Sequence, residues 1–133
     1  METILKTLCD RIEIAGNGKV SIHGIIDQIE AQSFPAKHPN LGIAVKVEYG
    51  PNEVGREVAI NLDLVMEDGG KFTVPNIMKR ELPPPAEPGR PAFWTCAFNL
   101  PYLTLPTPGR YQFVIRMNTR IAAEIPLFVV QAP

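Results

Sequence analysis

The sequence contains few of the residues that usually carry catalytic or metal chemistry. Its 133 residues include two cysteines, two histidines and only two serines, Ser21 and Ser33. Neither serine lies in a Gly-x-Ser-x-Gly turn, and Cys9 and Cys96 form no Cys-x-x-Cys pair. We therefore expect no catalytic residue, no metal site and no bound cofactor, and we expect both cysteines to be reduced thiols in the core.

An excess of charge of one sign and long apolar runs are also missing. Thirteen Lys and Arg residues stand against fourteen Asp and Glu residues, for a net charge of -1, so there is no basic field to attract nucleic acid or a membrane surface. No apolar run approaches the roughly 18 residues of a membrane span. The first residues, Met1-Glu2, are acidic where a secretion signal is basic. These features predict a cytoplasmic protein that binds neither nucleic acid nor membrane.

The 14 prolines are about twice the usual share and leave no room for long helices. What the sequence does contain is a regular alternation of apolar and polar side chains, which is typical of strands with one buried face. The alternation is clearest in residues 43–49, 58–66 and 111–117. Weaker strand patterns cover residues 5–14, 19–29, 71–74, 93–100 and 121–130, which makes about eight strands in all.

Turn signals complete the prediction of the fold. Gly16-Asn17-Gly18 favours a hairpin turn, and Gly24, where the apolar phase changes, indicates a bulge. Gly109 stands two residues before Tyr111, an arrangement similar to the tyrosine corner of immunoglobulin-like sandwiches. We expect an all-β protein, a single antiparallel β-sandwich domain over residues 1–133, immunoglobulin-like or jelly-roll-like, with a closed barrel as the alternative.

Two proline-rich segments interrupt the strand pattern. Residues 31–40 are predicted to be a loop that crosses between the sheets, because residues that precede proline favour extended geometry. Residues 82–91 hold five of the prolines and are predicted to run over the surface as an extended, polyproline-like loop.

The polar side chains form no clear site. His23 shares a strand face with Asp27, but the two lie about 13 Å apart by strand rise, so we interpret His23 as structural. Three acidic residues near a turn, Asp63, Glu67 and Asp68, are interpreted as solvated charges. The apolar residues Val65, Ala97 and Val114 fall on faces expected to be wet, and they indicate either a subunit contact or a strand buried on both faces.

Five short segments of the chain form a distinctive set. They are Cys9-Asp10 at the end of the first strand, Asn17-Gly18-Lys19, Gly24 to Asp27, Phe34 to Pro39 and the Pro-Gly-Arg-Tyr-x-Phe segment from Pro108 to Phe113. In these segments the sequence resembles a family of small uncharacterised bacterial proteins. The family is classed as a domain of unknown function. The resemblance therefore implies a bacterial β-sandwich and no particular activity.

We expect a non-enzymatic protein-interaction or assembly module that acts through a sheet edge or a loop, with another protein or a second copy of the chain as partner. The alternative is a small-ligand-binding protein or enzyme with a site between the sheets or at the loop end that carries Phe34, His38 and Arg90. A pocket of about 300 Å³ lined by converging polar groups would favour that alternative. The candidate partner-binding residues are Phe34, His38, Pro83, Pro84, Pro85 and Arg90.

Overall fold

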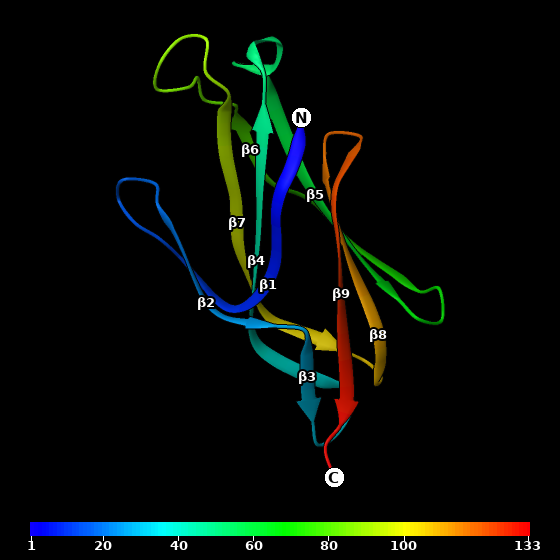
Figure 1. Ribbon diagram of the computed structural model, residues 1–133. Coiled ribbons are helices and arrows are strands. Elements are labelled where there is room, and N and C mark those ends of the chain that lie inside the picture. The colour runs from blue at the N-terminus through cyan, green and yellow to red at the C-terminus, as the bar shows by residue number, and fades with distance from the viewer.

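The computed structural model describes residues 1–133 and consists mostly of strands (Figure 1). Its helical structure is limited to the 3-10 turn η1 (Pro51–Glu53), and nothing in it has the length and apolar character of a membrane-spanning helix. The strands are β1 (Glu2–Ile14), β2 (Val20–Ile26), β3 (Gln28–Ala31), β4 (Ala36–Tyr49), β5 (Glu57–Met66), β6 (Lys71–Glu81), β7 (Ala92–Leu105), β8 (Gly109–Met117) and β9 (Arg120–Gln131).

The strands form two sheets that pack face to face, with the order β2-β1-β4-β7 in the first sheet and β3-β9-β8-β5-β6 in the second. The all-β sandwich predicted from the alternation is confirmed. The inner rows hold the alternating side chains, such as Val45 of β4, Ile60 of β5 and Phe113 of β8, each of which is fully buried. Burial of such a side chain contributes roughly 1.5–3 kcal/mol, so this shared core holds the sheets together.

The strand predicted at residues 19–29 is divided between the two sheets. The chain leaves the first sheet after Ile26 and enters the second at Gln28, and the carbonyl of Asp27 accepts a hydrogen bond from the backbone N–H of Phe128 at 2.9 Å. The crossing makes nine strands, and it leaves β3 parallel to β9. The prediction of a purely antiparallel sandwich is therefore wrong at this strand pair.

The bulge predicted at Gly24 is absent. The pairs on either side of it, Cys9 with Ile25 and Arg11 with His23, keep one register. Gly24 instead has a φ of +67°, and the carboxylate of Asp10 occupies the space that a Cβ atom would need. The apolar positions shift from one face of the strand to the other near Gly24 because the chain passes from the first sheet to the second between Ile26 and Gln28.

The tyrosine corner is confirmed. The Tyr111 hydroxyl donates to the carbonyl of Thr107 at 2.6 Å and accepts a hydrogen bond from the Thr107 N–H at 3.2 Å. Gly109 between them has a φ of +140°, which favours glycine. These bonds fix the start of β8 against the loop that follows β7.

The two proline-rich segments differ from their predicted form. The crossing loop is shorter than residues 31–40, because Ala36 to Asn40 belong to β4 and pair with the end of β7. Pro39 is tolerated there, since β1 pairs with β4 only as far as Gly42 and leaves the other edge of β4 free.

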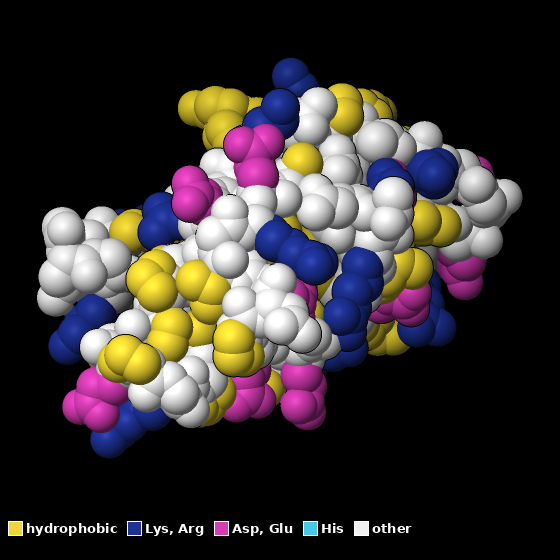
Figure 2. Space-filling view, turned by 90° about the horizontal axis from the view of Figure 1, so that it is seen from above, with side chains coloured by type: hydrophobic (Ala, Val, Ile, Leu, Met, Phe, Trp, Pro, Cys, Tyr) yellow, Lys and Arg dark blue, Asp and Glu magenta, His cyan; other side chains and the backbone are white.

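In the second segment the first residues are held against the sandwich instead of running over its surface. Leu82 is buried, and the carbonyl of Pro83 accepts a hydrogen bond from the Tyr49 hydroxyl at 2.5 Å. Burial raises the pKa of that phenol, which keeps it protonated as a donor. Beyond them the chain turns, with the N–H of Arg90 donating to the Glu87 carbonyl at 3.3 Å. Figure 2, viewed from the end that carries this loop, shows acidic and basic side chains interspersed, with no field of one sign.

The hairpin of β1 and β2 bends away from the sandwich edge (Figure 1) and covers part of the outer face of the first sheet. Under it lie small side chains, Ala44 and Ala97, in a separate buried cluster with Cys9 and Ile12. The Asn99 amide accepts from the N–H of Ile12 at 2.9 Å and donates to its carbonyl at 3.0 Å. Ala97 is therefore buried because the hairpin covers it, not because it marks a subunit contact.

We predict that Gly42→Ala destabilises the protein by about 1–3 kcal/mol, because the hairpin leaves no room for a side chain. The added Cβ would lie 2.6 Å from Cys9 Sγ, 2.9 Å from Ile12 Cγ1 and 3.2 Å from the Ile12 backbone nitrogen. Urea unfolding measures the loss. The control is Gly50→Ala, which meets no atom within 4 Å and has a φ of -97°, and it should stay within about 0.5 kcal/mol of the wild type. Equal stability of the two variants would contradict the tight packing of the hairpin.

Candidate functional site

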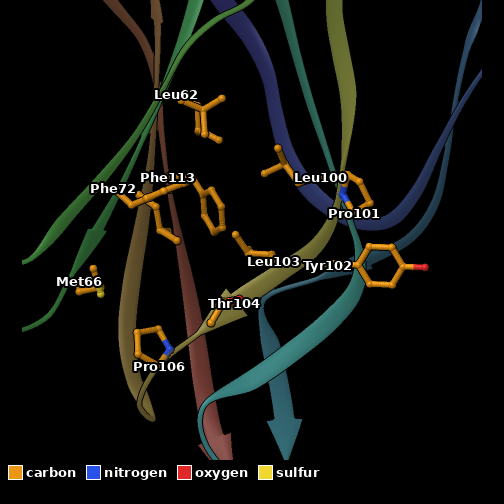
Figure 3. A pocket seen from close by; sticks show the side chains of 12 residues that line it. Leu62, Met66, Phe72, Leu100, Pro101, Tyr102, Leu103, Thr104, Pro106 and Phe113 are labelled. Atoms are coloured by element: carbon orange, nitrogen blue, oxygen red, sulfur yellow. The ribbon is translucent and has the colours of Figure 1, made fainter.

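The candidate site is an apolar cavity of about 460 Å³ between the two sheets. It lies where the edge strand of each sheet, β6 in one and β7 in the other, borders the sandwich interior (Figure 3). Nine of its twelve lining residues are hydrophobic. The lining residues are Leu62, Leu64, Met66, Phe72, Val74, Leu100, Pro101, Tyr102, Leu103, Thr104, Pro106 and Phe113.

The second sheet supplies one wall of the cavity. In its register Phe72 of β6 lies opposite Leu64 of β5, and Leu64 lies opposite Phe113 of β8. Residues directly opposite each other project from the same sheet face, so these three form one row across the wall. Leu64 and Phe113 are buried, whereas the Phe72 side chain is 55% exposed at the edge. The row therefore runs from the mouth of the cavity into the core.

The two sides of the sandwich are closed in different ways. On the side of β1 and β9, the Thr3 hydroxyl donates to the Ala122 carbonyl at 2.5 Å, and Lys6 Nζ donates to the Glu124 carbonyl at 3.0 Å. On the side of β6 and β7, the two edge strands are not hydrogen-bonded to each other. The cavity lies on this second side.

The β7 wall is built by a break in its alternation. Leu100 and Leu103 both pack against the core although they are an odd number of residues apart. Tyr102 between them has a φ of 53°, a left-handed conformation that is rare for a bulky residue and costs on the order of 1–3 kcal/mol. Its ring is 73% exposed and points away from the cavity (Figure 3). The strained residue thus turns Leu103 inward and keeps its own ring outside.

The facing strand, β6, is also irregular. Asn76 has a φ of 50°, and its N–H donates to the Asn61 side chain at 3.0 Å instead of to the strand ladder. Pro75 precedes it on the same edge. Proline and irregular backbone at the edge of a sheet oppose the addition of another strand. Both edges that border the cavity carry these features, since Pro101 precedes Tyr102 in β7.

No Asp, Glu, His, Cys, Lys or Arg lines the cavity, and the nearby charges already have partners. Glu67 accepts from the N–H of Arg110 at 3.2 Å, and Asp68 accepts from the N–H of Gly70 at 2.8 Å. Lys71 Nζ lies 3.9 Å from Asp63 Oδ2. The cavity therefore offers apolar contact and no ionic group.

Asp63 corrects one prediction, because it is not a solvated charge. Its side chain lies on the outer face of the second sheet and the residue is only 6% exposed. Arg116 Nε is 3.2 Å from its Oδ2, and the Thr73 hydroxyl donates to its Oδ1 at 2.8 Å. These partners compensate for the loss of water around the carboxylate.

The predicted partner-binding residues lie at opposite ends of the sandwich. Phe34 is half-buried against the core, and the half-buried His38 lies in β4 opposite Leu103 of β7. Pro83, Pro84, Pro85 and Arg90 lie in the loop between β6 and β7, at the end where Tyr49 pairs with Ala92. The part of β4 between His38 and Tyr49 is roughly 35 Å long at the usual strand rise. Phe34 and His38 therefore share no site with Arg90.

None of those six residues lines the cavity. The sequence pattern places Phe72 in a strand and Leu103 between strands, and it singles out neither as a site residue. One signal in the sequence points to the cavity: the apolar spacing changes between Leu100, where the predicted strand ends, and Leu103. His23 Nε2 lies 3.3 Å from Glu13 Oε2 at the surface, and its structural role stays a prediction.

Comparison with known proteins identifies the family. Residues 5–130 match a family described as a family of unknown function, DUF6941. The chain belongs to this family. This match confirms the resemblance to an uncharacterised family. No curated protein matches the chain.

Two solved structures are similar to this DUF6941 chain in fold. One is an alkylpurine DNA glycosylase from Pseudomonas fluorescens, bound to DNA containing an abasic site analog, with a TM-score of 0.55 and 9% identity over 96% of this chain. The DUF6941 chain spans 30% of that protein's chain. The other is an immunoglobulin-like protein from Pseudomonas aeruginosa, with a TM-score of 0.45 and 15% identity, covering 96% of this chain and 98% of that chain.

The two thiols of this DUF6941 protein are buried on opposite faces of the first sheet. Cys96 belongs to the main core, and Cys9 belongs to the cluster under the hairpin. Burial raises the pKa of Cys96 to about 12 and also raises that of Cys9. Both thiols therefore stay protonated at neutral pH. Because the first sheet lies between them, they cannot form a disulfide with each other.

We predict that neither thiol of the native protein reacts with dithiodipyridine at about pH 8, because a thiol whose pKa is raised holds its proton there and only the thiolate attacks. Both should react at once in denaturant, where the pKa returns to the ordinary value. Absorbance of the released pyridinethione measures the reaction. Rapid release of one equivalent from the native protein would contradict the burial of that cysteine.

Proposed function

We propose that this protein is a non-enzymatic binding protein that takes a small, uncharged, largely apolar molecule into the cavity between β6 and β7. The observation that carries the proposal is the cavity itself, which has about 460 Å³ and a mostly hydrophobic lining. Ligand pockets have volumes of about 300–1,000 Å³ and apolar walls. Because the lining lacks ionisable acids and bases other than the outward-pointing Tyr102 phenol, binding is better supported than catalysis.

A small molecule is a better occupant than an added strand. A strand would need regular, unpaired backbone along β6 or β7, but Pro75 and Asn76 interrupt the first and Pro101 and Tyr102 the second. These interruptions favour an occupant that depends on apolar contact instead of backbone pairing. The cavity has the volume set for the ligand-binding alternative but lacks the converging polar groups, so its size and the interrupted edges are what support that alternative over the interaction module.

The interaction or assembly role stays a prediction for other surfaces, namely the β2 edge and the loop with Pro83, Pro84 and Pro85. Light scattering tests a second copy as partner. The bacterial, cytoplasmic setting also belongs to the proposal, and two buried free thiols fit a reducing compartment. The tyrosine corner at Tyr111 favours an immunoglobulin-like over a jelly-roll form of the sandwich.

We predict that decahydronaphthol, a saturated and uncharged two-ring alcohol, binds in the cavity. A chemical-shift titration should move the backbone amides of residues 62–66 and 72–74, which line or border the site. Phe72→Ala should weaken the binding about threefold to tenfold, because it removes apolar area at the mouth.

Phe93→Ala is the matched control. Phe93 is another phenylalanine on an edge strand, 46% exposed, but it lies outside the cavity and packs under Lys46. This variant should bind as the wild type does. Absence of shifts at residues 62–66 and 72–74, or equal effects of the two alanine variants, would refute the proposed site.

A further inference from the structure

We infer that the ligand carries an uncharged aromatic ring, which packs against the exposed side chain of Phe72 at the mouth of the cavity. The inference rests on the proposed function and names the chemical class that the cavity selects. Three observations support it: the exposed phenyl group at the mouth, the rest of the lining, and the lack of charge.

Phe72 lies at the outer end of an apolar row in the second sheet. Phe72, Leu64 and Phe113 lie directly opposite one another on three adjacent strands. Leu64 and Phe113 have almost no exposed surface, so Phe72 is the phenyl group of this row that an entering ring can reach. A ring packed against Phe72 gains the aromatic contact that is favourable at centroid separations of about 4.5–7 Å.

The two phenylalanines of this row differ in their exposure to a ligand. Phe113 is fully buried and fixed at the inner end of the row, whereas Phe72 is 55% exposed on the edge strand. Figure 3 shows both rings on the same side of the cavity, with Leu103 and Leu100 facing them from β7. An entering ring would cover Phe72 and remove its exposed face from water, which adds apolar burial to the contact.

The remaining lining favours a flat, rigid molecule over a flexible chain. Apart from Thr104 and the outward-pointing Tyr102, no lining side chain carries a hydroxyl, amide or charged group. The binding free energy therefore depends mainly on apolar contact, reduced by the entropy lost on binding. A fused ring system has no rotatable bonds to freeze, whereas an alkyl chain has several. The Met66 thioether, also in the lining, makes favourable contacts with aromatic rings.

The ligand should also be uncharged. The lining provides no cation or anion to pair with a charged group, and the neighbouring Lys71, Glu67 and Asp68 already have partners. A charged group on the ring system would lose its water without compensation in this site.

The experiment compares three ligands built on the same fused two-ring framework by titration of the amides at residues 62–66 and 72–74. Naphthol should bind about twofold to tenfold more tightly than decahydronaphthol, and the anion naphthoate at least about tenfold more weakly than naphthol. In Phe72→Leu, which keeps the apolar area but removes the ring, the preference for naphthol over decahydronaphthol should fall toward one. Phe93→Leu should keep it.

Equal binding of naphthol and decahydronaphthol by the wild-type protein, or an unchanged preference in Phe72→Leu, would overturn the aromatic assignment and leave the proposed binding function intact. Equal binding of naphthoate and naphthol would overturn the requirement for an uncharged ligand. Absence of shifts at these amides with all three compounds would instead refute the proposed function.

Discussion

Contact between the inner rows of the two sheets is the interaction on which the rest of this structure depends. In β8 every second side chain from Tyr111 to Met117 is buried, as are Val58, Ile60, Leu62 and Leu64 in β5, and a slip of one residue in either strand would carry its row out of the core. The register is therefore fixed by burial. Register in turn decides which side chains stand opposite each other at the edges, including the row of Phe72, Leu64 and Phe113.

The cavity follows from how the sides of the sandwich are closed. Between β1 and β9, the bonds from Thr3 and Lys6 to backbone carbonyls tie one sheet to the other. Between β6 and β7 the only nearby tie is at the loop, where Tyr49 holds Pro83. Farther along this side no hydrogen bond joins β6 to β7. The apolar side chains of β5, β6 and β8 are therefore only partly covered by β7, and the uncovered space is the cavity.

The sequence predicted the fold better than the site, for a physical reason. Alternation is a local property, so the strands around Val45, Ile60 and Phe113 and the tyrosine corner at Tyr111 could be located from the residues alone. The change of sheet at Asp27 and the hairpin over Ala97 depend on pairing between distant segments, which local periodicity does not encode. The cavity depends on two edge strands that never contact each other through hydrogen bonds, so no spacing in the sequence could bring Phe72 and Leu103 together.

The conformation of Tyr102 argues that the cavity is more than a gap in the packing. If β7 kept its alternation beyond Leu100, the next inward side chain would be Tyr102, whose large ring could fill the space beside Leu62 and Phe113. The chain instead adopts a left-handed conformation that costs on the order of 1–3 kcal/mol and turns that ring into solvent. Strain of this kind concentrates at binding sites, where the structure around it maintains a shape that packing alone would not select.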